Sequence, residues 1–271
     1  ARVGNVVSNF SDFIGGGGGG SFPTIFLHKS QTWVPPQDGN IMIHVIGAGG
    51  SGSCSNNTQQ LESGAAGGYC RKNSLAVTTS GSFTVVVGAG GAATFGSFSA
   101  GVAGGTTSVA GTGLSSTLTA TGGAAGALSN NAHTTGGTAS NGDVNNAGGR
   151  GGFTKGGGAV GLTGAGNDGV VRDFLGTGGN CDILGDFYSS SLGQLSGGAG
   201  GDGQYVYNGT NDSNYMAGPL AGGGALYKGG INTSAGDASI GGGGGWGYYN
   251  GIGYVSSGRG GEGCVVIQYI P

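Results

Sequence analysis

The stretch QTWVPPQDGNIMIHVIGAGGSG, residues 31–52, decides the fold of this chain. Its two prolines and the Asp38-Gly39 pair predict a turn. The apolar segment 41–46 that follows predicts a β-strand buried on both faces, interrupted only by His44. The strand then ends abruptly in glycine, and much of the remaining chain repeats this step. We therefore expect a small β framework that carries an array of glycine-rich excursions.

The composition argues against both disorder and nucleic-acid binding. Glycine contributes 72 of the 271 residues and proline 5, a level that usually indicates low complexity when it has no period. However, hydrophobic residues make up 36% of the chain and charged residues only 8%, whereas disordered chains are rich in charge and poor in hydrophobic residues. The net charge of −3 offers no basic surface to a phosphate backbone. One large domain, or one domain with a short appendage, is expected.

Several segments outside residues 31–52 also predict strands. Expected strands cover residues 22–34, 69–77 and 82–87, with shorter ones at 94–99 and 116–121. The last is CVVIQYI, residues 264–270. The simplest topology pairs this last strand with an early strand and so closes the domain.

The N-terminal residues predict an amphipathic α-helix with a glycine hinge. Apolar side chains at spacings of three and four form one stripe over residues 2–14. The stripe consists of Val3, Val6, Val7, Phe10, Phe13 and Ile14. Glycines 15–20 end the helix and form a flexible joint. We expect residues 1–20 to attach the protein to a partner or to sister subunits, with folding back onto its own domain as the alternative. Residues 21–271 then form the glycine-rich domain.

The middle of the chain has a three-residue glycine period. Glycines recur at 152, 158, 161 and 164, and again at 197, 200 and 203. Three residues per turn is the period of an extended left-handed helix, and glycine at every third position lets such helices approach closely. Collagen is excluded because the period is often broken and proline is scarce. The expected fold class is mainly β with irregular glycine-rich structure. It comprises a small sheet or sandwich framework, a packed array of polyglycine II-type helices, and the short N-terminal α-helix.

The motifs that could carry chemistry are weak. GAGGSG, residues 47–52, matches a dinucleotide fingerprint, but a short polar stretch follows where a helix is required, and such matches arise by chance in a chain this rich in glycine. Residues 197–205 approach a calcium-binding nonapeptide without its hydrophobic position or tandem copies. A loose acidic cluster could hold a hard cation, with a solvated surface as the favoured alternative: Asp168, Asp173, Asp182 and Asp186. No enzyme, metal or cofactor is expected.

The cysteines predict no zinc site or disulfide scaffold. Cys54, Cys70, Cys181 and Cys264 are widely spaced and contain no CxxC pair, which favours buried free thiols; a Cys54–Cys70 bridge is the alternative. The sequence contains no run of about 18 apolar residues, so no membrane span is predicted. The N-terminus has no signal-peptide pattern. An extracellular role would then be reached by release of a virus particle on lysis.

Aromatic side chains that interrupt the glycine runs are the best candidates for binding. Tyrosine among serine, glycine and asparagine is the composition of antibody binding loops, because the rings give contact area at low entropic cost. The alternative is that the rings cap and shield the array. The candidate receptor-binding residues are Tyr188, Tyr205, Tyr207, Tyr215, Trp246, Tyr248 and Tyr249.

The order of three stretches resembles a known family. They are TWVPPQDGNIMIHVIGAGGSG (32–52), GGYCRKNSLAVTTSGSFTVVVGAGG (67–91) and GRGGEGCVVIQY (258–269). Together with the glycine-rich middle they resemble the glycine-rich domain of bacteriophage tail-fibre proteins. The chain is also similar to the receptor-recognition domain of T-even-type tail-fibre adhesins, where polyglycine helices carry the host-binding loops. The N-terminus departs from those adhesins, which have a larger attachment domain.

The resemblance implies a virion protein of the tail fibre or particle surface, assembled in the host cytoplasm. Its partner would be a bacterial surface receptor, an outer-membrane protein or a glycan, bound by loops at the tips of polyglycine helices. No nucleic acid and no membrane insertion are expected. The alternative is a purely structural virion component, such as a fibre segment or a capsid decoration protein, with its aromatic tips buried between subunits. A secreted polyglycine ice-binding or extracellular-matrix protein is a further alternative.

Overall fold

A computed structural model shows a mainly β protein and describes the framework and a large part of the glycine-rich region. The described residues are 24–56, 62–96, 98–128, 133–152, 164–166, 168, 205–206, 227–228, 240–245, 247–248 and 256–271. They form strands and extended segments with no helix, and hence none that could cross a membrane. The predicted N-terminal helix, with its attachment residues Val3, Val6, Val7, Phe10, Phe13 and Ile14, lies outside these residues.

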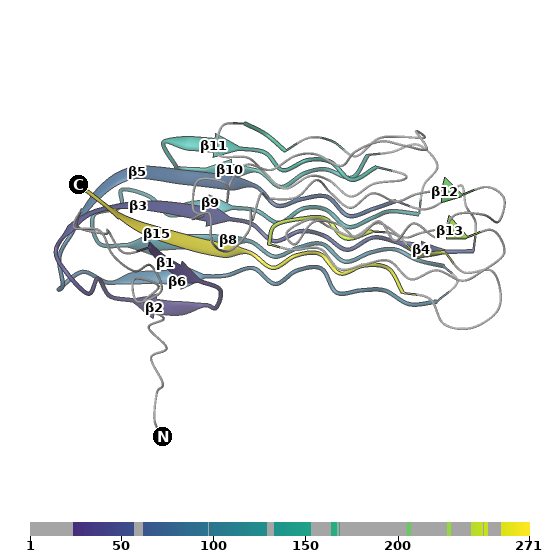
Figure 1. Cartoon of the computed structure of the whole chain (residues 1–271), viewed down its shortest axis with the longest axis horizontal. Helices are drawn as coiled ribbons and strands as arrows, with labels where there is room; N and C mark the ends of the chain where they lie inside the picture. The colour runs from purple at the N-terminus through teal and green to yellow at the C-terminus, as the bar shows by residue number, and fades with distance from the viewer. Residues whose placement is uncertain are drawn as a thin grey trace, which may run out of the picture.

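Two five-stranded antiparallel sheets form the framework (Figure 1). The first has the order β1 (Thr24–Leu27), β15 (Cys264–Ile270), β3 (Gly39–Ile46), β5 (Tyr69–Val77) and β11 (Val144–Asn146). The second has the order β10 (Ala139–Ser140), β9 (Leu118–Ala120), β8 (Thr107–Gly111), β6 (Phe83–Val86) and β2 (Gln31–Trp33). The chain passes between the two sheets at both edges, through β1 to β2 and through β10 to β11.

The pairing of β15 with β3 confirms that the last strand closes the domain. It runs from Cys264 opposite Ile46 to Ile270 opposite Asn40. The segment 41–46 is also confirmed as a deeply buried strand, and only Met42 within it is partly exposed. Since β15 lies between β1 and β3, the end of the chain sits inside the first sheet rather than at its edge.

The hydrophobic core lies between the inner faces of the two sheets. Alternate residues of β3, Ile41, Ile43 and Val45, point into it. From the second sheet, Trp33 and Phe83 contribute rings whose centroids lie 5.4 Å apart. Burial of a large aliphatic or aromatic side chain contributes roughly 1.5–3 kcal/mol to stability. This core therefore holds the strands in register where the glycine segments begin.

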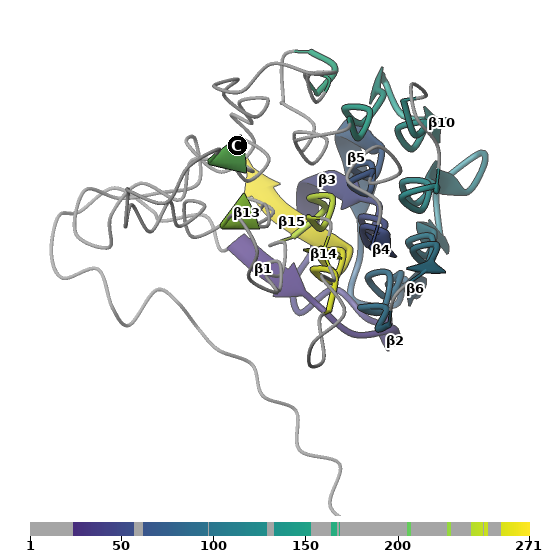
Figure 2. The same ribbon diagram turned by 90° about the vertical axis from the view of Figure 1, so that its right-hand side faces the viewer.

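Beyond the sandwich, strands of both sheets continue as extended glycine-rich segments that leave at one end (Figure 1). The segment after β3, residues 47–53, is called here the inner segment. It is fully buried although it contains no side chain larger than serine. Seen from the far end, several segments appear as triangular outlines set side by side (Figure 2).

Among the described residues, the inner segment has six neighbours bound through its backbone. Its N–H groups donate to three segments in turn, with a repeat of three residues. Gly47, Gly50 and Ser53 donate to Gly68, Ala65 and Glu62 of the first segment, respectively. Ala48 and Ser51 donate to Gly105 and Val102 of the second segment. Gly49 and Gly52 donate to Gly261 and Gly258 of the third segment. Its carbonyls accept from three further segments. The donors are Gly123 and Gly126 in one segment, Gly91 in another, and Gly244 and Gly247 in the third. Such pairing satisfies the backbone groups that burial removes from water.

Close packing explains why the inner segment is rich in glycine. A methyl group at Gly49 would overlap the carbonyl of Gly242, and one at Gly50 would overlap the carbonyl of Ala124. Glycine loses more conformational freedom on folding than any other residue. The sandwich offsets this entropic cost by fixing where each segment starts, and the hydrogen bonds on all sides fix its path.

Candidate binding tip

A three-stranded sheet lies at the end of the array that is farthest from the sandwich. Its central strand β4 (Cys54–Ser55) directly follows the inner segment and is labelled at that end in Figure 1. β4 pairs in parallel with β14 (Gly247–Tyr248) and antiparallel with β7 (Phe98–Ser99). We call this end of the molecule the tip. It brings together three parts of the chain that are far apart in sequence.

The described residues 94–96 and 98–99, called here the turn, present two phenylalanines to solvent at the tip. Phe95 is 65% exposed and Phe98 is 57% exposed, and Val102 nearby is also exposed. Phe98 stands opposite Ser55 in the small sheet, and Phe95 forms an antiparallel bridge with Ser256. Two large apolar side chains are thus exposed on residues that pair with β4 and with Ser256 at the tip.

Hydrogen bonds hold the ends of this turn in place. The Thr94 N–H donates to the Ser257 hydroxyl at 2.9 Å, and the Ser257 N–H donates back to the Thr94 carbonyl at 2.9 Å. The Ser99 hydroxyl donates to the Phe95 carbonyl at 3.0 Å. These bonds tie Thr94, Phe95 and Ser99 to their neighbours at the tip.

Buried polar groups lie just beneath the tip. Ser53 and Glu62 close the turn after the inner segment, because the Glu62 N–H donates to the Ser53 hydroxyl at 2.8 Å and that hydroxyl donates to the Glu62 carbonyl at 3.1 Å. The Glu62 carboxylate is itself buried and accepts the Ala127 N–H at 3.3 Å. The Ser63 hydroxyl is buried and has no hydrogen-bond partner among the described residues.

Only two of the predicted receptor-binding residues fall within the described backbone. Tyr205 begins β12 (Tyr205–Val206), which pairs in parallel with β13 (Tyr227–Lys228). Tyr248 lies in β14 at the tip, opposite Ser55. The side chains of Tyr205 and Tyr248 lie outside the described part of the structure. The remaining candidates lie outside it entirely: Tyr188, Tyr207, Tyr215, Trp246 and Tyr249. The role predicted for these rings stays a prediction.

Phe95 and Phe98 were missed by the sequence reasoning, which treated residues 94–99 as a short strand. Of these residues, Phe98–Ser99 form a strand, β7, as expected, whereas Phe95 forms a separate bridge with Ser256. The available signal was the sequence TFGSF between two glycine runs.

The proposed acidic cluster is described only at Asp168. One oxygen of this exposed carboxylate accepts the Arg150 N–H at 2.9 Å, and the other lies 4.0 Å from the Arg150 guanidinium. Asp173, Asp182 and Asp186 lie outside the described residues. Within the described part of the chain, no three potential metal-binding side chains come together.

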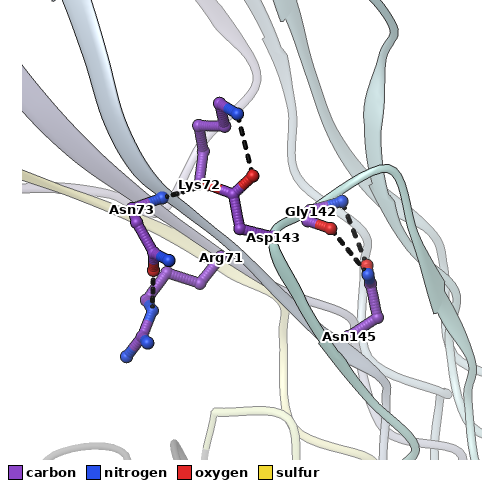
Figure 3. A network of polar contacts seen from close by, with 6 residues as sticks. All are labelled: Arg71, Lys72, Asn73, Gly142, Asp143 and Asn145. Carbon is purple, nitrogen blue, oxygen red and sulfur yellow. Dashed lines mark hydrogen bonds and ion pairs between the residues drawn. The ribbon is translucent and has the colours of Figure 1, made fainter.

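A polar network joins β5 to the β10–β11 turn at the side of the framework (Figure 3). The Asp143 carboxylate receives the Lys72 ammonium at 2.8 Å and the Asn73 N–H at 2.7 Å. The Lys72 hydrogen bond, with that from Asn73, holds the pKa of Asp143 below its usual value. Arg71 donates to the Asn73 side chain at 2.8 Å. Since every contact runs within the framework, we assign the network to positioning of the turn.

The buried cysteines and histidine are structural. Cys54, Cys70 and Cys264 are free and buried, which confirms the free-thiol prediction for these three and shows that the alternative Cys54–Cys70 bridge is wrong. Burial raises the pKa of Cys54 to about 11 and those of Cys70 and Cys264 to about 12. Thiols held in this protonated form are poor nucleophiles. Burial likewise lowers the pKa of His44 to about 4.

Comparison with protein-family models identifies the family of this chain. The family model described as "Glycine-rich domain" matches residues 25–270. These bounds run from β1 to the last residue of β15, so the match covers both the sandwich and the glycine segments. A comparison with curated proteins gives no match.

Proposed function

The chain belongs to the glycine-rich domain family, and we propose that it is a bacteriophage tail-fibre or adhesin-type virion protein. In this proposal it binds a receptor on the bacterial surface, either an outer-membrane protein or a glycan, through loops at the tip of the array. The resemblance of residues 31–269 to tail-fibre domains motivates the proposal.

The observation that carries the proposal is that the chain enters the domain at one end while the tip lies at the other end. Thr24, where the chain enters β1 from residues 1–23, pairs with Gln268 near the outer end of β15. The inner segment starts after Ile46, which pairs with Cys264 at the other end of β15. Attachment through the N-terminal residues would therefore hold the sandwich and leave the tip facing away. An adhesin requires this separation between its attachment point and its binding surface.

We also infer that the glycine-rich segments are polyglycine II-type helices. The inner segment sends successive N–H groups to three different neighbours and returns to the first at every third residue. A helix with three residues per turn directs its backbone groups in this way. Six neighbours around one segment also match hexagonal packing of such helices. The array then acts as a stiff support that carries its end loops clear of the framework.

For residues 1–20 we propose an attachment or oligomerisation role. The stripe of Val3, Val6, Val7, Phe10, Phe13 and Ile14 would dock on another virion protein or on sister subunits. Deletion of residues 1–20 should leave unfolding of the domain unchanged but release it from its partner in a co-purification assay. Unfolding of the truncated protein would place the segment in the core instead.

Adsorption competition tests the receptor-binding proposal directly. Purified protein is added to host cells before challenge with the cognate virus, and adsorption is expected to fall. A folded variant with Tyr205, Tyr207, Tyr248 and Tyr249 changed to alanine should lose this blocking. A correctly assembled protein that binds no cells would instead indicate a purely structural component of the particle.

A further inference from the structure

We propose that Phe95 and Phe98 form an apolar anchor that enters an uncharged pocket on a protein receptor. This inference rests on the proposed function, and it commits to a protein rather than a glycan for this part of the tip. The two rings were not among the residues that sequence composition singled out.

The exposure of the two rings is the first argument. Both are more than half exposed, and they lie within four residues of each other on one turn. Isolated apolar side chains on a surface are ordinary, but a local group of them indicates an interaction site. Aromatic anchors that fill a pocket on the partner carry most of the energy of many protein interfaces.

Preorganisation of the turn is the second argument. Thr94 and Ser257 are joined by reciprocal hydrogen bonds, and Phe98 is paired with Ser55 in the small sheet. The backbone at Thr94 and Phe98 therefore needs little further ordering on binding, and ordering of loops adds to the cost of association. The backbone at both phenylalanines is thus already paired before a receptor binds.

The described hydroxyls beside the turn favour a protein over a glycan. A sugar hydroxyl that is buried without a hydrogen bond is destabilising, so a glycan needs free donors and acceptors beside the ring. A phenylalanine ring has neither a hydrogen-bond donor nor a hydrogen-bond acceptor group. The nearby hydroxyls of Ser99 and Ser257 are already bonded to the Phe95 carbonyl and to Thr94. An apolar protein pocket makes no such demand.

Charge around the turn points the same way. No side chain is charged in the described residues that pair with or adjoin the turn, 54–56, 92–96, 98–103, 247–248 and 256–257, and the exposed Arg259 is the first charged residue after them. Contact at this surface should therefore depend little on ionic strength, because salt screens only charged interactions. An uncharged apolar pocket is the complementary partner.

The test uses outer-membrane vesicles from a bacterial strain that the full chain binds. The double variant Phe95→Ser/Phe98→Ser should bind at least about tenfold more weakly, as expected when an aromatic anchor is removed. The matched control Val34→Ser/Val86→Ser removes two exposed apolar side chains from the sandwich and should bind like the wild type. Circular dichroism and thermal unfolding verify that both variants are folded.

Treatment of the vesicles identifies the partner class. Proteolysis should abolish the component of binding that the two phenylalanines provide, while periodate oxidation of glycans should leave it intact. Phe95→Tyr/Phe98→Tyr should also weaken binding, because it places hydroxyl groups in an apolar pocket. Binding of the wild type should change less than about twofold between low and high salt.

Four outcomes overturn the inference. Equal binding by the double variant removes the anchor while leaving the proposed function in place. Loss of binding after periodate but not after proteolysis indicates a glycan. Equal binding to protein-free vesicles of phosphatidylethanolamine and phosphatidylglycerol indicates a lipid surface. A wild-type protein that binds no strain overturns the proposed function and this inference together.

Discussion

The Nδ1 atom of His44 lies 2.8 Å from the hydroxyl of Tyr69, and both side chains are buried within the first sheet. The Nε2 atom lies 3.3 Å from the side-chain oxygen of Gln268 on β15. Three strands, β3, β5 and β15, are thus joined by one neutral imidazole. The core lies on the other face, because neighbours of His44 such as Ile43 and Val45 point into it.

Stability should fall as the pH drops from about 6.5 to about 4. Burial lowers the pKa of His44 to about 4, so the unfolded chain takes up a proton in this range before the folded chain does. Proton uptake by the unfolded state lowers the free energy of unfolding, by about 3 kcal/mol across the full range. Chemical denaturation at a series of pH values measures this loss. In the His44→Gln variant the free energy of unfolding should change less steeply with pH. An unchanged slope would show that other groups cause the loss of stability.

Glycine in the inner segment should resist replacement by alanine. Gly49→Ala and Gly50→Ala place a methyl group against backbone carbonyls that cannot move independently. Overpacking of this kind costs about 1–3 kcal/mol or more. Gly164→Ala is the matched control, since no atom lies within 4 Å of its added methyl group, and it should be nearly neutral. Urea unfolding curves compare the three variants, and equal midpoints would contradict the tight packing.

Two buried serines beneath the tip should respond in opposite ways to alanine. Ser53→Ala removes hydrogen bonds to both the N–H and the carbonyl of Glu62, and we expect a loss of about 1–2 kcal/mol. Ser63→Ala removes a buried hydroxyl that has no described partner and should be neutral or stabilising by up to about 1 kcal/mol. Thermal unfolding distinguishes them. A larger loss for Ser63→Ala would reveal an unrecognised partner of that hydroxyl.

The buried thiols should be unreactive in the folded protein. In a Cys181→Ser background, Cys54, Cys70 and Cys264 remain, and burial holds the pKa of each at about 11 or above. A thiol-specific reagent at pH 8 should label none of them in the native state. In denaturant without reductant it should label all three. Fewer than three labelled thiols would indicate a disulfide.

The strands with strong apolar patterns could be predicted from the sequence. Segments 41–46, 69–77 and 264–270 carry dense apolar or alternating side chains, and the structure has β3, β5 and β15 there. β8 (Thr107–Gly111) was missed because only Val109 of its residues is large and apolar. β10 and β11 were missed because they are short and mostly polar. Pairing with β9 and β5 defines them, and pairing is not local information.

The candidate site was predicted only in outline. Glycine punctuation correctly indicated that strands would lead into excursions, but the composition directed attention to tyrosines rather than to Phe95 and Phe98. Exposure of those two rings depends on the path of the chain at Phe95 and Phe98 at the tip. That path is fixed by Ser256 and Ser257, more than 150 residues later. No local pattern could reveal it.

The ring of six segments around residues 47–53 also constrains how the chain folds. The inner segment is made early, but its bonding partners include residues 102, 123, 244 and 261. Loop closure across such separations opposes folding until the late contacts form, and folds with high contact order are slow. During synthesis, the N–H groups of Gly49 and Gly52 therefore lack their carbonyl partners until the segment that precedes β15 has been made. A ribosome-bound chain stopped before residue 258 would expose an incomplete glycine lattice, so this domain completes its folding after translation of its last segment.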